Sequence, residues 1–171
     1  MELSENKQAI VERHNKVVYV DGDRIVKVFK ATKPASDVFN EALNIARVTE
    51  AGVRVPREVS QVADGAWALS TEYVAGVTMR SLMDAAEGTD EYDRLLEQFV
   101  DFQIEIQGTP APELLKDQKT KIAGMVGKTP DLDPSVRYDL QMRTDRMAPG
   151  HSICHCDFNP SNVIVAEDGT L

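Results

Sequence analysis

Two strand-like segments around a tight turn constrain the fold of this chain more than any other feature. Residues 16–20 (KVVYV) and 24–29 (RIVKVF) are rich in β-branched and aromatic residues and flank the tripeptide Asp21-Gly22-Asp23. Segments of this kind on either side of a Gly-containing turn predict a β-hairpin. The chain therefore has to place an antiparallel sheet near its N-terminus.

A helix and further strands are expected around this hairpin. Apolar residues recur at helical spacing from Ser36, the predicted N-cap, to Gly52, a residue type that ends helices. Additional strands are expected at 9–11, 53–59 and 67–74. An antiparallel sheet joined to helices predicts the α+β class.

The chain changes character at Gly76. The pattern of residues 81–107 is helical, with an apolar stripe recurring every three to four residues. Residues 113–147 are polar, with helical stretches that we expect to be interrupted at Gly124, Gly127, Pro130 and Pro134. Residues 163–166 predict a final strand.

The composition restricts the cellular location of the protein. No apolar run approaches the roughly 18 residues that a membrane-spanning helix needs. The first residues are polar and include acids, so they are not a secretory signal. The two cysteines, Cys154 and Cys156, lie two residues apart, which suits a reducing compartment better than a disulfide framework. The expected location is cytoplasmic.

The net charge of −9 excludes nucleic acid and anionic membranes as main partners, because both require basic surfaces. It permits a cationic ligand. Acidic residues outnumber basic ones between residues 84 and 117, and we interpret them as a solvated helix face.

Residues 155–162 (HCDFNPSN) carry the strongest chemical signal. They fit the spacing H-x-D-x-x-x-x-N and lead into the apolar run Val163-Ile164-Val165. In the catalytic loop of kinases with this spacing, the aspartate receives the proton of the substrate hydroxyl and the asparagine binds magnesium. Here those positions are Asp157 and Asn162. Because both residue types also favour turns, a plain structural loop is the competing interpretation.

Upstream residues fit the same chemistry. Lys27 lies in the middle of a predicted strand, where its side chain can reach the phosphates of a nucleotide, and Glu41 on the following helix can pair with it. Alternatively, Lys27 faces solvent and Glu41 is an ordinary surface acid. Glu72 and Val74 end the last strand before Gly76, where the backbone can bind a purine edge.

In these segments the sequence resembles the aminoglycoside phosphotransferase family of small-molecule kinases. The matching segments are VKVF at 26–29, EA at 41–42, GVRVP at 52–56, EYVAG at 72–76 and HCDFNPSNVIV at 155–165. The resemblance implies a protein-kinase-like bilobal fold, with an N-terminal lobe at 1–75 and an incomplete helical lobe at 76–171. It implies ATP-dependent phosphorylation of a hydroxyl on a small, aminoglycoside-like molecule.

The resemblance also implies roles for individual residues. Asp157 would be the catalytic carboxylate and Asn162 a Mg²⁺ ligand. Lys27 would contact the phosphates of ATP, with Glu41 orienting it. Backbone groups of Glu72 and Val74 would bind the adenine.

Three departures from the family pattern affect this expectation. Cys156 stands where the family has glycine, which can strain the loop. The turn at 12–15 (ERHN), which would cover the nucleotide, has no glycine. The second metal-binding aspartate is expected after the turn at 167–169 and is not among the 171 residues. We therefore expect a front portion of a longer kinase that is inactive or weak alone, with exposed apolar surface that could drive self-association.

Two alternatives stay open. The chain could be a non-catalytic, kinase-like binding module. A soft-ligand cluster, with His151, Cys154, His155 and Cys156 within six residues, could also bind zinc. Neighbouring strand positions point to opposite faces, however, so the four side chains can hardly converge.

Overall fold

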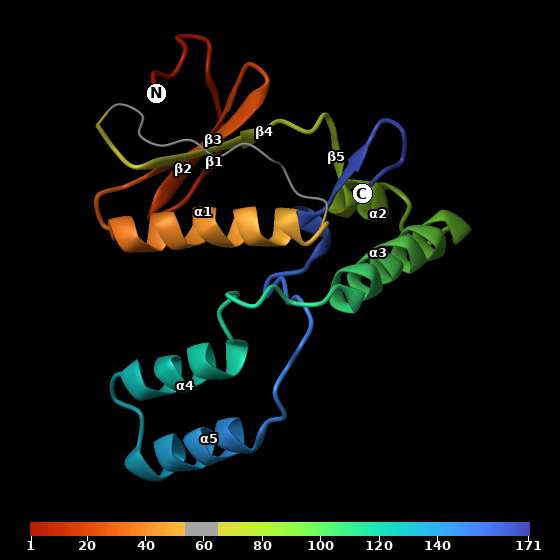
Figure 1. Ribbon diagram of the computed structural model, residues 1–171. Helices are drawn as coiled ribbons and strands as arrows, with labels where there is room; N and C mark the ends of the chain where they lie inside the picture. The colour runs from red at the N-terminus through yellow and green to blue at the C-terminus, as the bar shows by residue number, and fades with distance from the viewer. Residues whose placement is uncertain (54–64) are drawn as a thin grey trace.

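The first part of the chain is a four-stranded antiparallel sheet with one helix along a face (Figure 1). The computed structural model describes residues 1–53 and 65–171. The strands lie in the order β1-β2-β3-β4. These elements are β1 (Gln8–Glu12), β2 (Lys16–Asp21), β3 (Arg24–Phe29), α1 (Ala35–Glu50) and β4 (Ala68–Glu72).

The predicted hairpin is confirmed. β2 and β3 pair in register from Asp21 opposite Arg24 to Lys16 opposite Phe29, and Gly22 takes a φ of +66° in the turn. Positive φ is readily adopted only by glycine, so this residue allows the tight reversal. Side-chain alternation then directs Phe29 toward α1, where it packs with Val38.

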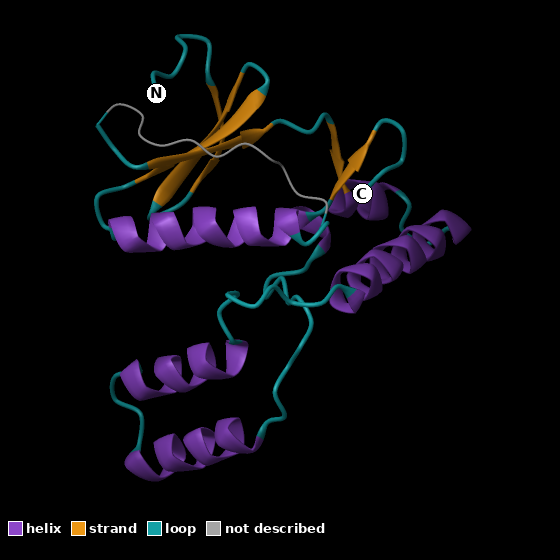
Figure 2. Cartoon of the chain, in the orientation of Figure 1, coloured by secondary structure: helices purple, strands orange, loops and turns teal. Residues whose placement is uncertain are grey.

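The second part of the chain is mainly helical (Figure 2). A small two-stranded sheet, α2 and α3 adjoin the first part, while α4 and α5 pack on each other and extend away from it. The elements are β5 (Gly76–Thr78), α2 (Met79–Ala85), α3 (Asp90–Gly108), α4 (Gln118–Lys128), α5 (Pro134–Arg146), the 3₁₀ turn η1 (Pro160–Asn162) and β6 (Ile164–Ala166). The chain is thus α+β, as predicted.

A buried apolar cluster joins α2, α3 and the segment before β6. Met79, Phe102, Ile153 and Val163 are among its members. The amide of Met79 donates to the carbonyl of Val163 at 2.8 Å, which ties the start of α2 to the end of the HCDFNPSN loop. Residues from the two ends of this part therefore share one core.

Several predicted boundaries were wrong. Ser36 is not the N-cap, because α1 already begins at Ala35, and Pro34, with its extended backbone, is the capping position. The helix expected at 81–107 is two helices, separated where Gly88 takes a φ of +78°. The expected strand at 67–74 covers only 68–72. The strand expected at 53–59 lies almost entirely outside the described residues.

The glycines of the polar segment were also misinterpreted. α4 runs without a break through Gly124 and Gly127, because each glycine costs only about 1 kcal/mol and the helix also packs against α5. Pro134 does not interrupt a helix but occupies the first turn of α5, where its missing N–H is not needed. In the described part of the chain, no helix combines the length and apolar character that crossing a bilayer requires.

Gly76 is required by close packing, since a β-carbon there would collide with the carbonyl oxygen of Val165. Gly76→Ala should lower the free energy of unfolding by about 1–3 kcal/mol, because the β5–β6 pairing would have to open. Urea denaturation followed by circular dichroism measures the change. Gly124→Ala is the matched control, as nothing lies near that position and alanine favours helix. Equal stability of the two variants would contradict the packing role.

Candidate functional site

The predicted ion pair between Lys27 and Glu41 is present. Lys27, in the middle of β3, places its Nζ 3.1 Å from Oε1 of Glu41 on α1. A second lysine, Lys33 in the loop between β3 and α1, places its Nζ 2.8 Å from Oε2 of the same carboxylate. Each oxygen of Glu41 therefore has its own ammonium partner.

The two lysines keep Glu41 ionised. Burial alone would raise the pKa of this carboxyl, but hydrogen bonds and charge from Lys33 and Lys27 outweigh it and hold the pKa below its ordinary value. A depressed pKa in the folded state stabilises the protein above the pKa of the unfolded chain. That contribution is lost as the pH falls through the folded value.

The backbone after β4 is partly anchored and partly available. The amide of Tyr73 donates to the carbonyl of Asp23 at 2.9 Å, which fixes the chain as it leaves the sheet next to Glu72. Among the described residues, the amide of Val74 makes no hydrogen bond. A ligand's purine edge could therefore pair with this amide without displacing a protein contact.

Asp157 and Asn162 lie together on one loop, as predicted. Nδ2 of Asn162 donates to Oδ2 of Asp157 at 3.0 Å and to its backbone carbonyl at 2.8 Å. Nδ2 of Asn159 donates to Oδ1 of Asp157 at 3.1 Å. Two side-chain amides thus fix the orientation of the carboxylate, which remains exposed.

Phe158 anchors this loop to α3. Its ring stacks on Phe99, with centroids 4.5 Å apart, and lies 6.0 Å from Phe102 and 5.9 Å from His155. His155 accepts a hydrogen bond from the Asp157 amide through Nδ1 at 3.3 Å, a structural contact within the loop. Phe158 is half-buried, and its ring contacts hold the HCDFNPSN loop against α3.

The backbone of Cys156 is strained, as its place in the motif suggested. Its φ is +67°, in the left-handed region that residues with a β-carbon avoid. Burial and the neighbouring Cys154 raise the pKa of the Cys156 thiol.

Cys156→Gly should therefore raise the free energy of unfolding by about 0.5–1 kcal/mol. Relief of left-handed strain contributes about 1–2 kcal/mol, and the extra entropy of an unfolded glycine opposes it by about 0.5–1 kcal/mol. Urea titration monitors the change. Cys154→Gly is the control, because that residue does not have a positive φ and should only lose stability. A destabilised Cys156→Gly would show that the strain is not relieved.

The described residues do not favour a zinc site. Cys154 and Cys156 have their sulfurs 3.6 Å apart, and both residues are exposed. In the part of the chain that the structure describes, no three His, Cys, Asp or Glu side chains lie close enough to hold a metal ion. A Mg²⁺ ion would have to bind with help from another group, such as a bound phosphate.

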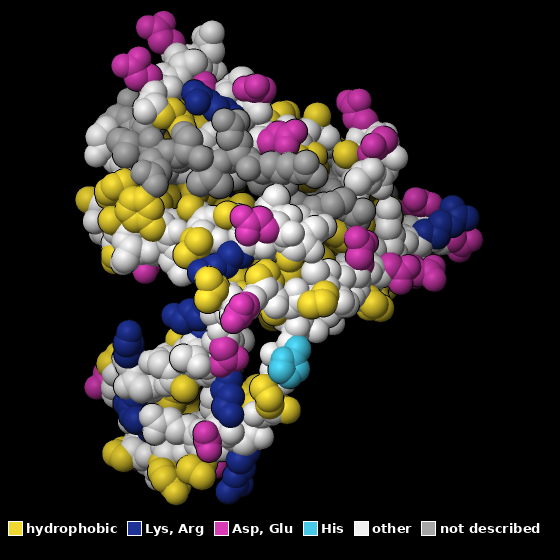
Figure 3. Space-filling model, viewed as in Figure 1, with side chains coloured by type: hydrophobic (Ala, Val, Ile, Leu, Met, Phe, Trp, Pro, Cys, Tyr) yellow, Lys and Arg dark blue, Asp and Glu magenta, His cyan; other side chains and the backbone are white. Residues whose placement is uncertain are grey.

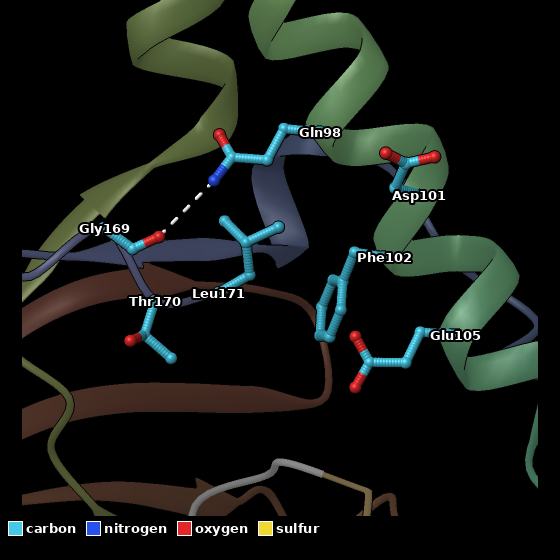
Figure 4. A pocket seen from close by; sticks show the side chains of 7 residues that line it. All are labelled: Gln98, Asp101, Phe102, Glu105, Gly169, Thr170 and Leu171. Atoms are coloured by element: carbon cyan, nitrogen blue, oxygen red, sulfur yellow. Dashed lines mark hydrogen bonds between the residues drawn. The ribbon is translucent and has the colours of Figure 1, made fainter.

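A cavity of about 310 Å³ lies between α3 and the last residues of the chain (Figure 4). Nε2 of Gln98 donates to the carbonyl of Gly169 across it at 3.4 Å. None of the predicted site residues lines this cavity. Its lining residues are Gln98, Asp101, Phe102, Glu105, Gly169, Thr170 and Leu171.

Two residues of the site were missed by sequence reasoning. Lys33 gave no signal, because a lysine next to Pro34 looks like an ordinary loop residue. Asn159 could have been found, since it lies two residues after Asp157, within reach of a hydrogen bond back to it, as asparagine often makes in turns. The relation of Asp157 to Lys27 across the molecule stays a prediction.

Known structures share this fold at low sequence identity. A thermostable mutant of aminoglycoside phosphotransferase APH(4)-Ia in its apo form superposes with a TM-score of 0.58 and 12% identity, over 95% of this chain and 64% of that one. A ternary complex of the same protein with AMP-PNP and hygromycin B gives 0.56 and 12%, over 95% and 63%. A choline/ethanolamine kinase family protein from Mesorhizobium loti gives 0.55 and 19%, over 93% and 54%.

This chain therefore spans somewhat more than half of each of those proteins. No curated protein matches it significantly. At the sequence level, the profile of the phosphotransferase enzyme family matches residues 8–171, which include the Lys27–Glu41 pair and the whole HCDFNPSN loop. The chain belongs to the phosphotransferase enzyme family.

Proposed function

We propose that this chain carries the nucleotide-binding residues and catalytic loop of a kinase that transfers the γ-phosphate of ATP to a hydroxyl group of a small molecule. The observation that carries the proposal is the orientation of Asp157. Amides of Asn159 and Asn162 hold its two oxygens, yet the residue stays exposed to a substrate. A carboxylate fixed in this way can accept a hydroxyl proton without reorganising.

Each of the other residues has a defined task. Lys27 neutralises charge on the phosphates, and Glu41 keeps the lysine extended. The backbone of Glu72 and Val74 binds the adenine between the proposed lobes, residues 1–75 and 76–171. Asp157 accepts the proton of the attacking hydroxyl and orients its oxygen in line with the γ-phosphate.

The oxygen donors of the loop could bind Mg²⁺ only together with the oxygens of bound phosphates. Because Nδ2 of Asn162 donates to Asp157, its Oδ1 is left as a hard ligand. When bound, the ion would neutralise charge on the transferred phosphoryl group. The contribution of this chain is to hold Asn162 and Asp157 in one fixed arrangement.

The acceptor is proposed to be a cationic amino-alcohol or aminosugar. One structural neighbour is a complex with AMP-PNP and hygromycin B, and another belongs to a choline/ethanolamine kinase family. A net charge of −9 suits a cationic substrate. Acidic side chains gather around the end of the molecule that carries α2 and α3 (Figure 3). The two exposed thiols suit a reducing, cytoplasmic setting.

The test is an ATP-consumption assay against a panel of aminoglycosides and small amino-alcohols, with mass spectrometry of the product. It should be run on the 171-residue chain and on any longer form of the protein that contains it. A phosphorylated acceptor, formed only with ATP, would support the proposal. Nucleotide binding without transfer in a longer form would favour the non-catalytic binding module.

The 171-residue chain by itself should show no acceptor-dependent turnover, and Mg²⁺ should change its ATP affinity by less than about threefold. Within its described residues no carboxylate cluster completes a metal site around Asn162. Calorimetric titration of ATP with and without Mg²⁺ measures the effect. Robust turnover would mean that another chain or an unassigned residue supplies the missing ligand.

A further inference from the structure

Two lysines pair with the carboxylate of Glu41, and the charge of a third acts on the same group. Lys27 and Lys33 pair with its two oxygens at 3.1 and 2.8 Å. Lys16, at the start of β2, is the third, and its charge interacts with both lysines and with Glu41. Arg13 also acts on Lys16, so this region is rich in positive charge although the net charge of the protein is −9.

The strand register brings these lysines together. Lys16 lies directly opposite Phe29, and Lys27 lies two residues before Phe29 on the same strand. Residues that are opposite or two apart point to one face of a sheet, so Lys16 and Lys27 share the face that packs against α1. Lys33 reaches the same face, since its Nζ lies 4.2 Å from the centre of the Phe29 ring.

Lys16 is the member whose charge is not balanced. Lys27 and Lys33 already occupy both oxygens of Glu41, and among the described residues Lys16 makes no ion pair. Burial lowers the pKa of Lys16, and repulsion from Lys27 lowers it further, while Glu41 opposes the shift. A half-buried cation beside other cations is costly unless an anion joins it.

The surroundings suit a phosphate group. Lys16 follows the turn at 12–15, which has no glycine whose backbone amides could approach phosphates closely. A cationic side chain at this position can replace that function, because it binds phosphate oxygens as a point charge. Lys33 also lines a cavity of about 300 Å³ at this end of the sheet, together with His14, Asn15, Thr32, Pro34 and Asp37.

We propose that Lys16 is a second phosphate-binding residue beside Lys27, and that Lys33 is a positioning residue that neutralises and holds Glu41. The proposal rests on the proposed function in taking the anion to be the phosphates of a nucleotide. The positive charge of Lys16 substitutes for the glycine amides that this turn lacks. With Lys33 on Glu41, Lys27 is able to share its hydrogen bonds with a phosphate.

Titration calorimetry on the 171-residue protein tests this, with ATP, AMP and inorganic tripolyphosphate as separate ligands. Lys16→Met should weaken the binding of ATP and of tripolyphosphate about tenfold, which is the low end of the value of one charge-assisted contact. The affinity for AMP should change by less than about twofold. Lys30→Met is the matched control. Lys30 is exposed, pairs with Glu12 at 3.0 Å and should leave all three affinities within about twofold of wild type.

Lys33 is tested by charge rescue. Lys33→Met should weaken the binding of ATP by about threefold to tenfold. Lys33→Arg keeps a positive charge beside Glu41 and should retain most of the wild-type affinity. If Lys33 has a purely structural role, Lys33→Met should instead lower the melting temperature and weaken the binding of ATP and AMP equally. Circular dichroism melts of every variant separate these results.

The outcomes also separate this proposal from the proposed function. If Lys27→Met weakens ATP but Lys16→Met behaves like Lys30→Met, the second phosphate contact is overturned and the kinase proposal stands. If tripolyphosphate binding depends on Lys16 while no form of the protein phosphorylates an acceptor, the lysine cluster stands and the kinase proposal fails. Absence of binding of either anion to the wild-type protein at millimolar concentration would also overturn the cluster.

Discussion

Asp157→Asn should lower the turnover number for acceptor phosphorylation by about a thousandfold, the usual contribution of a general base. The affinity for nucleotide should stay within about threefold, because the carboxylate acts on the acceptor and not on ATP. Asparagine keeps the size of the side chain and can still meet one of the loop amides, so the loop should fold. The measurement is steady-state kinetics in a form of the protein that turns over an acceptor, with calorimetry for the nucleotide.

Asp139→Asn is the control for this variant. Asp139 is an exposed residue on α5 that pairs with Arg143 four residues later at 2.8 Å, and such surface pairs contribute little. Its removal should leave turnover unchanged. A turnover number for Asp157→Asn within about tenfold of wild type would show that Asp157 is not the base.

Lys27→Met should lower kcat/KM for ATP by about tenfold to a hundredfold, because one charge-assisted phosphate contact of about 1.5–3 kcal/mol is lost. The variant also leaves Glu41 with a single ammonium partner, Lys33. Because that carboxylate stays paired, the melting temperature should fall only slightly. Binding of AMP, which lacks the β- and γ-phosphates, should change far less than binding of ATP.

Glu41→Gln separates the two tasks of this pair. If Glu41 orients Lys27, the Glu41→Gln variant should show part of the loss in kcat/KM for ATP that Lys27→Met shows. It should also lack the acid-sensitive part of the stability that the depressed pKa of Glu41 provides. If Lys27→Met leaves kcat/KM for ATP unchanged, Lys27 does not contact the nucleotide.

Much of the first part of the chain could be predicted from local pattern. The turn at Gly22 and the β-branched residues on either side of it specify a hairpin by themselves, because both signals act over a few residues. The Lys27–Glu41 pair was also predictable, since a strand and the helix that follows it bring those positions into contact. Local pattern gave the wrong prediction at Gly124 and Pro134. Glycine can end a helix or lie within one, and proline can interrupt a helix or occupy its first turn.

The residues of the HCDFNPSN loop could be singled out from the sequence, but their arrangement could not. Motif spacing indicated Asp157 and Asn162. Only the folded loop reveals that the side-chain amide of Asn159 also donates a hydrogen bond to the Asp157 carboxylate. The strain at Cys156 was suggested by the glycine usual at that place in the family, and the φ of +67° confirms it.

The sequence by itself determined the α+β class and the hairpin, and it indicated the Lys27–Glu41 pair and the shared loop of Asp157 and Asn162, because these depend on periodicity and on motifs within a few residues. Only the tertiary structure decided that Lys16 and Lys33 lie around Glu41. Lys16 lies at the start of β2 and Lys33 in the loop before α1, whereas Glu41 lies on α1 itself. Side-chain pattern and turn geometry set the strand register. Which side chains gather at one carboxylate depends also on how α1 and the loop before it pack on the sheet, through contacts between separate elements.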